Sequence, residues 1–169
     1  MKPEYVCHPL APVYDSRSKV LLLGTMPSPR SRTEGFYYAH PRNRFWPVMG
    51  RIWEEPAPET TEERRRFCLE HHIALWDVLS SCVIQGAGDS SIREPQPNPV
   101  EKILREAPVQ AVFVTGRKAY ELYNRYCLPR TGMEAFLLPS TSPANCAVSV
   151  EKLAEAYQVI LPYCIGGKI

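Results

Sequence analysis

The 169-residue sequence predicts an α/β protein of three layers (αβα), in which helices cover both faces of a central four-stranded parallel sheet. Four short apolar segments support this prediction, because they alternate with stretches of helical character. These segments are residues 19–24, 73–78, 110–115 and 134–138. Each runs into a loop rich in Gly, Pro or polar residues. Right-handed crossovers place the ends of parallel strands on one edge of a sheet, so we expect these loops to form one composite ligand site.

Start and stop signals define the expected helices. Thr60, with Glu63 three residues later, forms a capping box that begins a charged helix reaching about residue 72. Asn98 followed by Pro99 is typical of a cap and a first helical position, and predicts a helix to about residue 106. The other expected helices span residues 44–53, 117–126 and 149–161, and residues 85–98 are expected to be a loop.

Composition limits the possible classes of protein. Hydrophobic residues make up 44% of the chain and charged residues 22%, which suits a single globular domain over residues 1–169. No apolar run reaches the roughly 18 residues that span a bilayer, and the N-terminus lacks the apolar region of a signal peptide. We therefore expect a cytoplasmic monomer with no membrane partner. Six cysteines without a CxxC pair indicate free thiols and no metal site.

The positive charge is concentrated in one segment. The net charge is only +2, but residues 26–53 contain five arginines and a single acid, Glu34. Such a patch beside aromatic residues fits a phosphate backbone, and it equally fits a solvated arginine face. Within it, residues 36–46 read Phe-Tyr-Tyr-Ala-His-Pro-Arg-Asn-Arg-Phe-Trp. Rings that can stack and an amide that can bond a polar edge indicate a pocket for a nucleobase.

Several motifs occur in the order found in a known family. Gly24-Thr25-Met26-Pro27-Ser28 precedes the segment 38–46, and residues 114–120, 138–145 and 149–157 extend the match. Together they resemble the uracil-DNA glycosylase superfamily, and the segment 38–46 is similar to the mismatch-specific enzymes. Met26 stands where that branch has Asn, and Ser140 stands where other branches have His or Asn. The resemblance is closest to the hypoxanthine-DNA glycosylase branch, often called family six.

The resemblance implies hydrolysis of the N-glycosidic bond of a flipped deaminated base, chiefly hypoxanthine, in DNA, with no metal or organic cofactor. It implies that Asn43 is catalytic, whereas propensity alone favours Asn43 as a helix cap. It assigns base binding to Tyr38, Gly24, Thr25, Met26, His40 and Ser140. It assigns DNA binding to Arg42, Arg44, Ser142, Pro143, Ala144 and Asn145. The implied partner is DNA containing deaminated bases.

Several roles stay open at this point. Tyr38 matches the stacking aromatic of the family, but it also suits the core. His40 suits a structural or phosphate-contact role better than general acid catalysis, and Ala144 is small for a residue that fills the gap left by a flipped base. Asp77 and Asp89 follow the second strand, where a carboxylate can orient water or position Asn43.

Three alternatives to the hypoxanthine enzyme remain. The same fold can prefer uracil or mismatched bases. The substitutions at Met26 and Ser140 also allow a non-catalytic nucleic-acid- or nucleotide-binding module. The third alternative is an unrelated nucleotide hydrolase that uses the same edge of the sheet.

Overall fold

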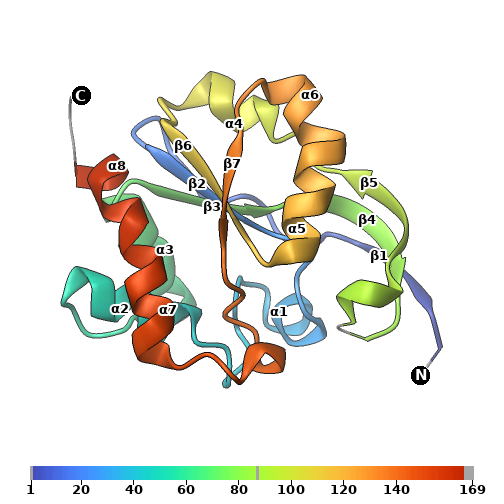
Figure 1. Cartoon of the computed structure of the whole chain (residues 1–169), viewed down its shortest axis with the longest axis horizontal. Coiled ribbons are helices and arrows are strands. Elements are labelled where there is room, and N and C mark those ends of the chain that lie inside the picture. Colours follow the sequence, from blue (N-terminus) through green and yellow to red (C-terminus); the bar gives the residue numbers. More distant parts are fainter. Residues whose placement is uncertain (1, 87, 166–169) are drawn as a thin grey trace.

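A computed structural model describes residues 2–86 and 88–165 (Figure 1). Of the predicted domain 1–169, residues 1, 87 and 166–169 lie outside the described part. The main sheet contains β2 (Val20–Gly24), β3 (Ile73–Asp77), β6 (Ala111–Thr115) and β7 (Ala135–Leu138). Its order is β3-β2-β6-β7, and all three pairings are parallel. The predicted four-stranded parallel sheet is therefore confirmed.

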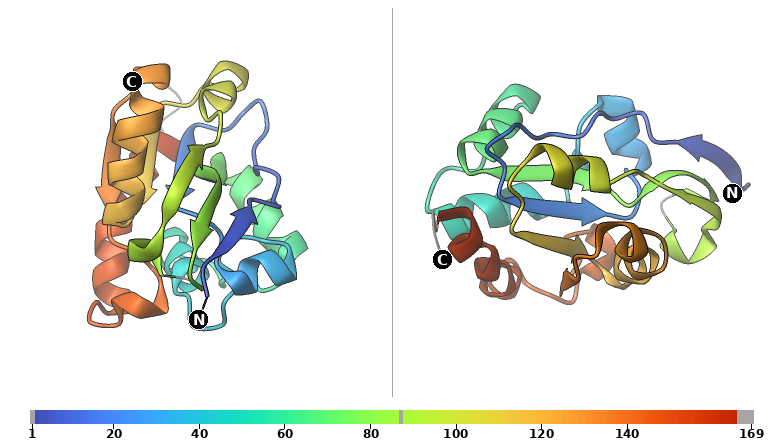
Figure 2. Two further views of the ribbon diagram at one scale, coloured as in Figure 1. Left: turned by 90° about the vertical axis from the view of Figure 1, so that its right-hand side faces the viewer. Right: turned by 90° about the horizontal axis from the view of Figure 1, so that it is seen from above.

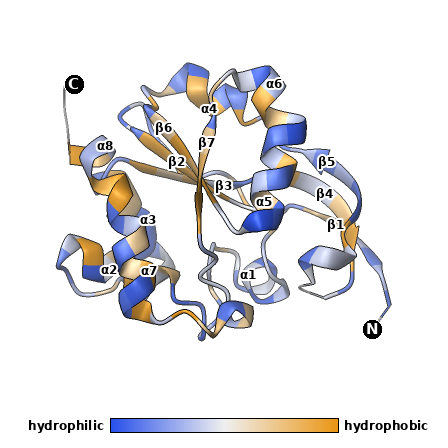
Figure 3. Ribbon diagram, in the orientation of Figure 1, coloured by the Kyte–Doolittle hydropathy of each residue, from blue (hydrophilic) through white to orange (hydrophobic). Residues whose placement is uncertain are grey.

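Helices cover both faces of this sheet, which confirms the three-layer prediction (Figures 1 and 2). One face carries α2 (Phe45–Trp53), α3 (Thr61–Glu70) and α7 (Val150–Tyr157), and the other carries α5 (Arg117–Leu122). Every residue of β2, β3 and β6 is buried. Strands covered on both faces are apolar almost throughout, and Figure 3 shows them as the apolar centre of the molecule.

The remaining helical segments are short. They are α1 (Pro29–Glu34), α4 (Glu101–Glu106), α6 (Leu128–Thr131), α8 (Leu161–Ile165), three 3₁₀ turns (Asp89–Ser91, Pro143–Asn145, Gln158–Ile160) and a π turn (Tyr123–Cys127). The expected helix 117–126 is thus α5 followed by the π turn, and the expected helix 149–161 is α7 followed by a 3₁₀ turn. Within the described residues, none of the helices combines the length and the apolar character that crossing a membrane requires.

A second sheet, which the sequence did not predict, lies beside the first. It is antiparallel, with β4 (Leu79–Ile84) between β1 (Glu4–Cys7) and β5 (Arg93–Pro97). The expectation that 85–98 is entirely loop is therefore wrong. β5 reads Arg-Glu-Pro-Gln-Pro, and an edge strand tolerates proline and polar residues that normally indicate a loop. The pairing of β1 with β4 also brings the N-terminal segment to the end of β3.

The expected cap at Asn98 is also wrong. The Asn98 side chain donates hydrogen bonds to the carbonyl oxygens of Asp77 and Leu79, at 2.9 and 3.0 Å. It therefore stabilises the turn from β3 into β4, and α4 begins only at Glu101. A buried amide bonded to two backbone oxygens satisfies carbonyl groups that the change of sheet would leave unpaired.

The charged helix α3 covers the aromatic segment from outside. Phe36 stacks on Trp46 with ring centroids 6.2 Å apart, and both rings are buried. The guanidinium of Arg64 lies over the Trp46 ring and that of Arg65 over the Phe36 ring, each at 5.3 Å. Two cation–π contacts thus fix α3 against the segment that enters the site.

The capping box at Thr60 provides a test of local stability. Its hydroxyl accepts the Glu63 N–H, and the Glu63 carboxylate accepts the Thr60 N–H. Thr60→Ala should lower the free energy of unfolding by about 0.5–2 kcal/mol, because it leaves an N–H at the helix start unpaired. Urea titration measures the loss. Thr60→Ser keeps the hydroxyl and should remain near the wild type; equal losses in both variants would contradict the cap.

Candidate active site

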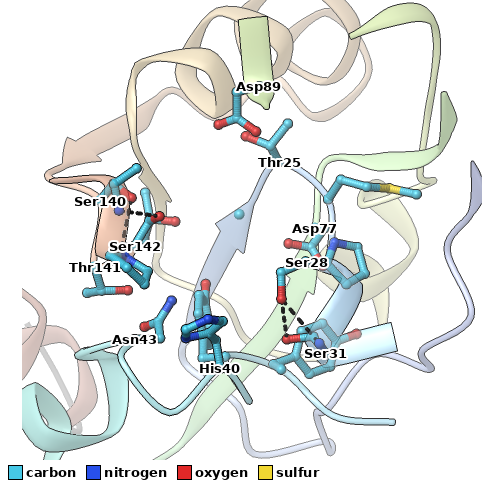
Figure 4. A pocket seen from close by; sticks show the side chains of 18 of the residues that line it. Thr25, Ser28, Ser31, His40, Asn43, Asp77, Asp89, Ser140, Thr141 and Ser142 are labelled. Atoms are coloured by element: carbon cyan, nitrogen blue, oxygen red, sulfur yellow. Dashed lines mark hydrogen bonds between the residues drawn. The ribbon is translucent and has the colours of Figure 1, made fainter. Parts of the chain in front are cut away.

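A cavity of about 350 Å³ opens at the carboxyl edge of the parallel sheet (Figure 4). Gly24 ends β2, Asp77 ends β3 and Thr115 ends β6, and all three border the cavity. Ser140, in the loop after β7, borders it from the opposite side. Four strand ends from distant parts of the chain therefore meet at one site, as the predicted topology requires.

Tyr38 borders this cavity with its ring held by the neighbouring helix. It stacks on Phe45, with centroids 3.9 Å apart and planes 11° apart. Its φ angle of +54° lies in the left-handed region, which is uncommon for a bulky residue and is typical of functional sites. Burial raises the pKa of Tyr38, and the charge of Asp77 raises it further, so the phenol stays protonated.

Asn43 borders the same cavity, and its amide has a fixed orientation. The Phe45 N–H donates to Asn43 Oδ1 at 2.9 Å, and the Asn43 N–H donates to the His40 carbonyl oxygen at 2.9 Å. With the side-chain oxygen turned to the start of α2, the amide nitrogen points into the cavity (Figure 4). The N-cap of α2 is Arg44, not Asn43 as propensity suggests, but the Asn43 side chain still bonds the first N–H of the helix while its amide lines the cavity.

His40 lies at the cavity beside Asn43. Its Nδ1 accepts the Arg42 N–H at 3.0 Å, so the neutral ring carries its proton on Nε2. Arg42 itself is exposed and does not border the cavity. Its predicted contact with DNA phosphate stays a prediction, and its exposure is compatible with it.

The loop after β7 forms the facing wall. Ser140 Oγ accepts the Ser142 N–H at 3.1 Å, and Ser142 Oγ accepts the Ala144 N–H at 3.2 Å. The Asn145 amide donates to the Ser140 carbonyl oxygen at 2.9 Å and closes the loop. Residues 140–144, which include Pro143, border the cavity, whereas Asn145 does not.

Arg44 holds this loop from inside the protein. Its guanidinium donates to the carbonyl oxygens of Ser142 and Asn145, at 2.9 and 2.8 Å, and to that of Val148. Its own N–H donates to the Thr141 carbonyl oxygen at 3.1 Å. This geometry favours a role in ordering the loop over the predicted phosphate contact.

A buried acid–histidine pair occupies the other side of the cavity. His8 Nε2 and Asp77 Oδ2 are 2.7 Å apart, and their side chains are only 2% and 6% exposed. The Leu10 N–H donates to His8 Nδ1 at 3.2 Å, so the His8 proton is on Nε2 and is donated to Asp77. His8 was not predicted as a site residue, because it reaches Asp77 only through the pairing of β1 with β4.

The position of the Asp77 carboxylate requires glycine at position 24. A Cβ atom at position 24 would lie 2.6 Å from Asp77 Oδ1, closer than nonbonded atoms approach. The Cβ atom would also be 3.5 Å from the Tyr38 hydroxyl. The close approach of Asp77 to the end of β2 therefore depends on the missing side chain.

The other predicted residues occupy the rim and walls. Thr25 and Met26 border the cavity, and Asp89 is exposed at its edge. Among residues 2–86 and 88–165, no group of three or more His, Cys, Asp or Glu side chains is arranged to hold a metal ion. That the reaction needs no metal or cofactor stays a prediction.

Comparisons with known proteins agree with this fold and site. The model of the uracil DNA glycosylase superfamily matches residues 11–161. A hypoxanthine DNA glycosylase of Methanosarcina acetivorans is 32% identical over 85% of this chain and 90% of its own length. A hypoxanthine DNA glycosylase of Methanosarcina barkeri is 32% identical over 79% of this chain and 85% of its own length. A solution NMR structure of a proposed uracil DNA glycosylase from Methanosarcina acetivorans is 28% identical, covers 89% of this chain and 96% of its own, and has a TM-score of 0.75.

The fold and the site thus define an α/β protein with a cavity of about 350 Å³ at the carboxyl edge of its sheet. The chain belongs to the uracil DNA glycosylase superfamily, and the family predicted from its motifs is confirmed.

Arg42 and Arg44 provide a test of which arginine contacts DNA phosphate. Replacing a phosphate-contacting arginine lowers the slope of log K against log salt concentration by about 1. We expect Arg42→Gln to lower this slope, and Arg44→Gln to weaken binding without lowering it. Fluorescence anisotropy with a DNA duplex at several salt concentrations measures both.

Hydrogen exchange of residues 141–148 supplies the control. Arg44→Gln should speed exchange there because the loop loses its guanidinium bonds, whereas Arg42→Gln should not. A reduced salt slope for Arg44→Gln with unchanged exchange would contradict the ordering role.

Proposed function

We propose that this protein is a DNA glycosylase that hydrolyses the N-glycosidic bond of a flipped hypoxanthine base, with Asn43 as the catalytic amide. The observation that carries the proposal is the joint placement of Asn43 and Tyr38 on one cavity at the carboxyl edge of the sheet. The names of the two Methanosarcina relatives support hypoxanthine as the base. A cytoplasmic, monomeric enzyme acting in base-excision repair completes the proposal.

The cavity fits the physical demands of base flipping. Extrusion of a nucleotide from the stack costs a few kcal/mol. Stacking on an aromatic ring returns roughly 1–3 kcal/mol, so a platform such as Tyr38 offsets much of that cost. The neutral, small side chains of Ser142 and Ala144 at the rim let a DNA backbone approach closely.

The reaction needs electrostatic stabilisation more than a nucleophilic side chain. The oxygen of water bonds to C1′ of the sugar, the C1′–N electron pair leaves with the base, and one water proton ends on the base. Negative charge develops on the base as the bond breaks, and a fixed donor in a water-poor cavity stabilises it. Because Phe45 holds the oxygen of Asn43, the amide nitrogen is the donor that faces this charge.

A panel of oligonucleotides tests the activity and its alternatives. Matched duplexes carry deoxyinosine, deoxyuridine or deoxyxanthosine, and alkali cleaves the strand wherever a base has been removed. Breaks at deoxyinosine support the proposal, and breaks at uracil alone would reassign the base. Binding without breaks would instead indicate a non-catalytic module. Base release from mononucleotides alone would indicate a nucleotide hydrolase.

Variants of Asn43 separate catalysis from capping. Asn43→Ala should lower the single-turnover rate of hypoxanthine release by about 10²–10³, because it removes a transition-state donor. It should also lose about 0.5–2 kcal/mol of stability, because the Phe45 N–H at the start of α2 loses its acceptor. Asn43→Ser keeps an oxygen for the Phe45 N–H but has no amide, so we expect near-normal stability and the same loss of rate. If Ser restores the rate together with the stability, Asn43 only supports the start of α2 and is not catalytic.

A further inference from the structure

We propose that Asp77 selects the base: its free carboxylate oxygen accepts the ring N–H that deaminated purines carry at N1 and adenine lacks. This inference rests on the proposed function, because it concerns the base held in the same cavity. It also gives His8 the role of a positioning residue. The juxtaposition that carries it is a buried His8–Asp77 pair with one oxygen left open to the cavity.

The two oxygens of Asp77 have different surroundings. Oδ2 accepts the proton of His8 Nε2 at 2.7 Å. Oδ1 lies over the end of β2, where Gly24 leaves room for it, and makes no side-chain hydrogen bond to the described residues. Figure 4 shows the carboxylate directed into the cavity, across from Asn43 and Ser140. One strong acceptor is therefore presented to whatever occupies the cavity.

His8 fixes the chemical character of this group. Its Nδ1 is occupied by the Leu10 N–H, so its single ring proton is directed at Asp77. The bond from His8 occupies Oδ2, so Oδ1 is the acceptor that the carboxylate has left for a ligand. The Asp77 side chain is only 6% exposed, so its open oxygen binds a hydrogen-bond donor well. A ligand without a donor leaves this buried oxygen unpaired, which costs free energy.

That character matches the difference between hypoxanthine and adenine. Hypoxanthine is a lactam with a hydrogen on N1, whereas N1 of adenine is an unprotonated acceptor that would face the carboxylate with like polarity. Sites built to bond a polar hydrogen reject analogues without it strongly, because their own buried group loses its partner. Asp77 thus discriminates hypoxanthine from adenine, the base from which it arises, but it does not exclude guanine, which also carries a hydrogen on N1.

The charge of Asp77 argues for selection over leaving-group activation. A carboxylate next to a base that is gaining negative charge does not stabilise that charge. The donor that does so in the proposed mechanism is the amide of Asn43, which faces the cavity from another side. Recognition and activation are therefore assigned to different residues.

The test compares two bases in the same DNA duplex. Deoxyinosine carries the N1 hydrogen, and deoxynebularine, with an unsubstituted purine, has neither that hydrogen nor the 6-oxygen. The ratio of their single-turnover excision rates is measured for the wild type and for Asp77→Asn. Intrinsic differences between the two bases cancel when the ratios are compared.

Asp77→Asn changes the character of the open atom. In this variant His8 Nε2 donates to the side-chain oxygen of the new asparagine, so the asparagine presents its N–H groups to the cavity. The inosine-to-nebularine ratio should then fall by about 10- to 100-fold, as expected for a hydrogen bond to a charged group. If Asp77 instead orients water, both rates fall together and the ratio is unchanged, which would overturn the proposal.

Two controls complete the design. Asp89→Asn removes a carboxylate at the rim of the same cavity and should keep the wild-type ratio. His8→Ala should lower the ratio, and His8→Gln, whose amide can still donate to Asp77, should restore it. If the inosine-to-nebularine ratio of both His8 variants equals that of the wild type, the positioning role of His8 is contradicted.

An inhibition measurement on the wild type tests the same contact without relying on a variant that could fail to fold. Free hypoxanthine should inhibit base release from DNA at about 10- to 100-fold lower concentration than free purine. Equal inhibition would overturn the proposal. If the wild type releases no hypoxanthine from DNA, the proposed function fails. Direct binding of the two free bases, followed by tyrosine and tryptophan fluorescence, then tests the contact alone.

Discussion

The hydrogen bond from the Phe45 N–H to Asn43 Oδ1 is the interaction on which the account of this site depends. It satisfies the N–H of Phe45, the first residue of α2, and it turns the amide nitrogen of Asn43 into the cavity. Phe45 also supports the Tyr38 ring, so the platform and the amide share one anchor. A donor fixed by the backbone needs no reorganisation during the reaction, which is the condition for electrostatic catalysis.

The sequence predicted the main sheet because its strands are buried on both faces and read as continuous apolar runs, such as Val20–Gly24. It did not predict the second sheet. β5 contains two prolines and two charged residues, and β1 has only Val6 buried, so neither has a strong periodic pattern. Such edge strands form because of their partners, which local propensity does not encode.

The same limit explains what was found and missed in the site. Asn43 and Tyr38 lie close in sequence within a distinctive aromatic segment, and their common cavity could be predicted. His8 and Asp77 are 69 positions apart, and their contact depends on the unpredicted pairing of β1 with β4. The loop-ordering role of Arg44 likewise depends on carbonyl groups about 100 residues away, which no local pattern indicates.

The most direct measurement is a crystal structure of the slow Asn43→Ala variant bound to a duplex that contains deoxyinosine. The account predicts a flipped hypoxanthine inside the cavity, in contact with the Tyr38 ring, with N1 within hydrogen-bonding distance of Asp77 Oδ1. A base left stacked in the duplex, or seated with N1 turned away from Asp77 and its ring remote from position 43, would contradict it.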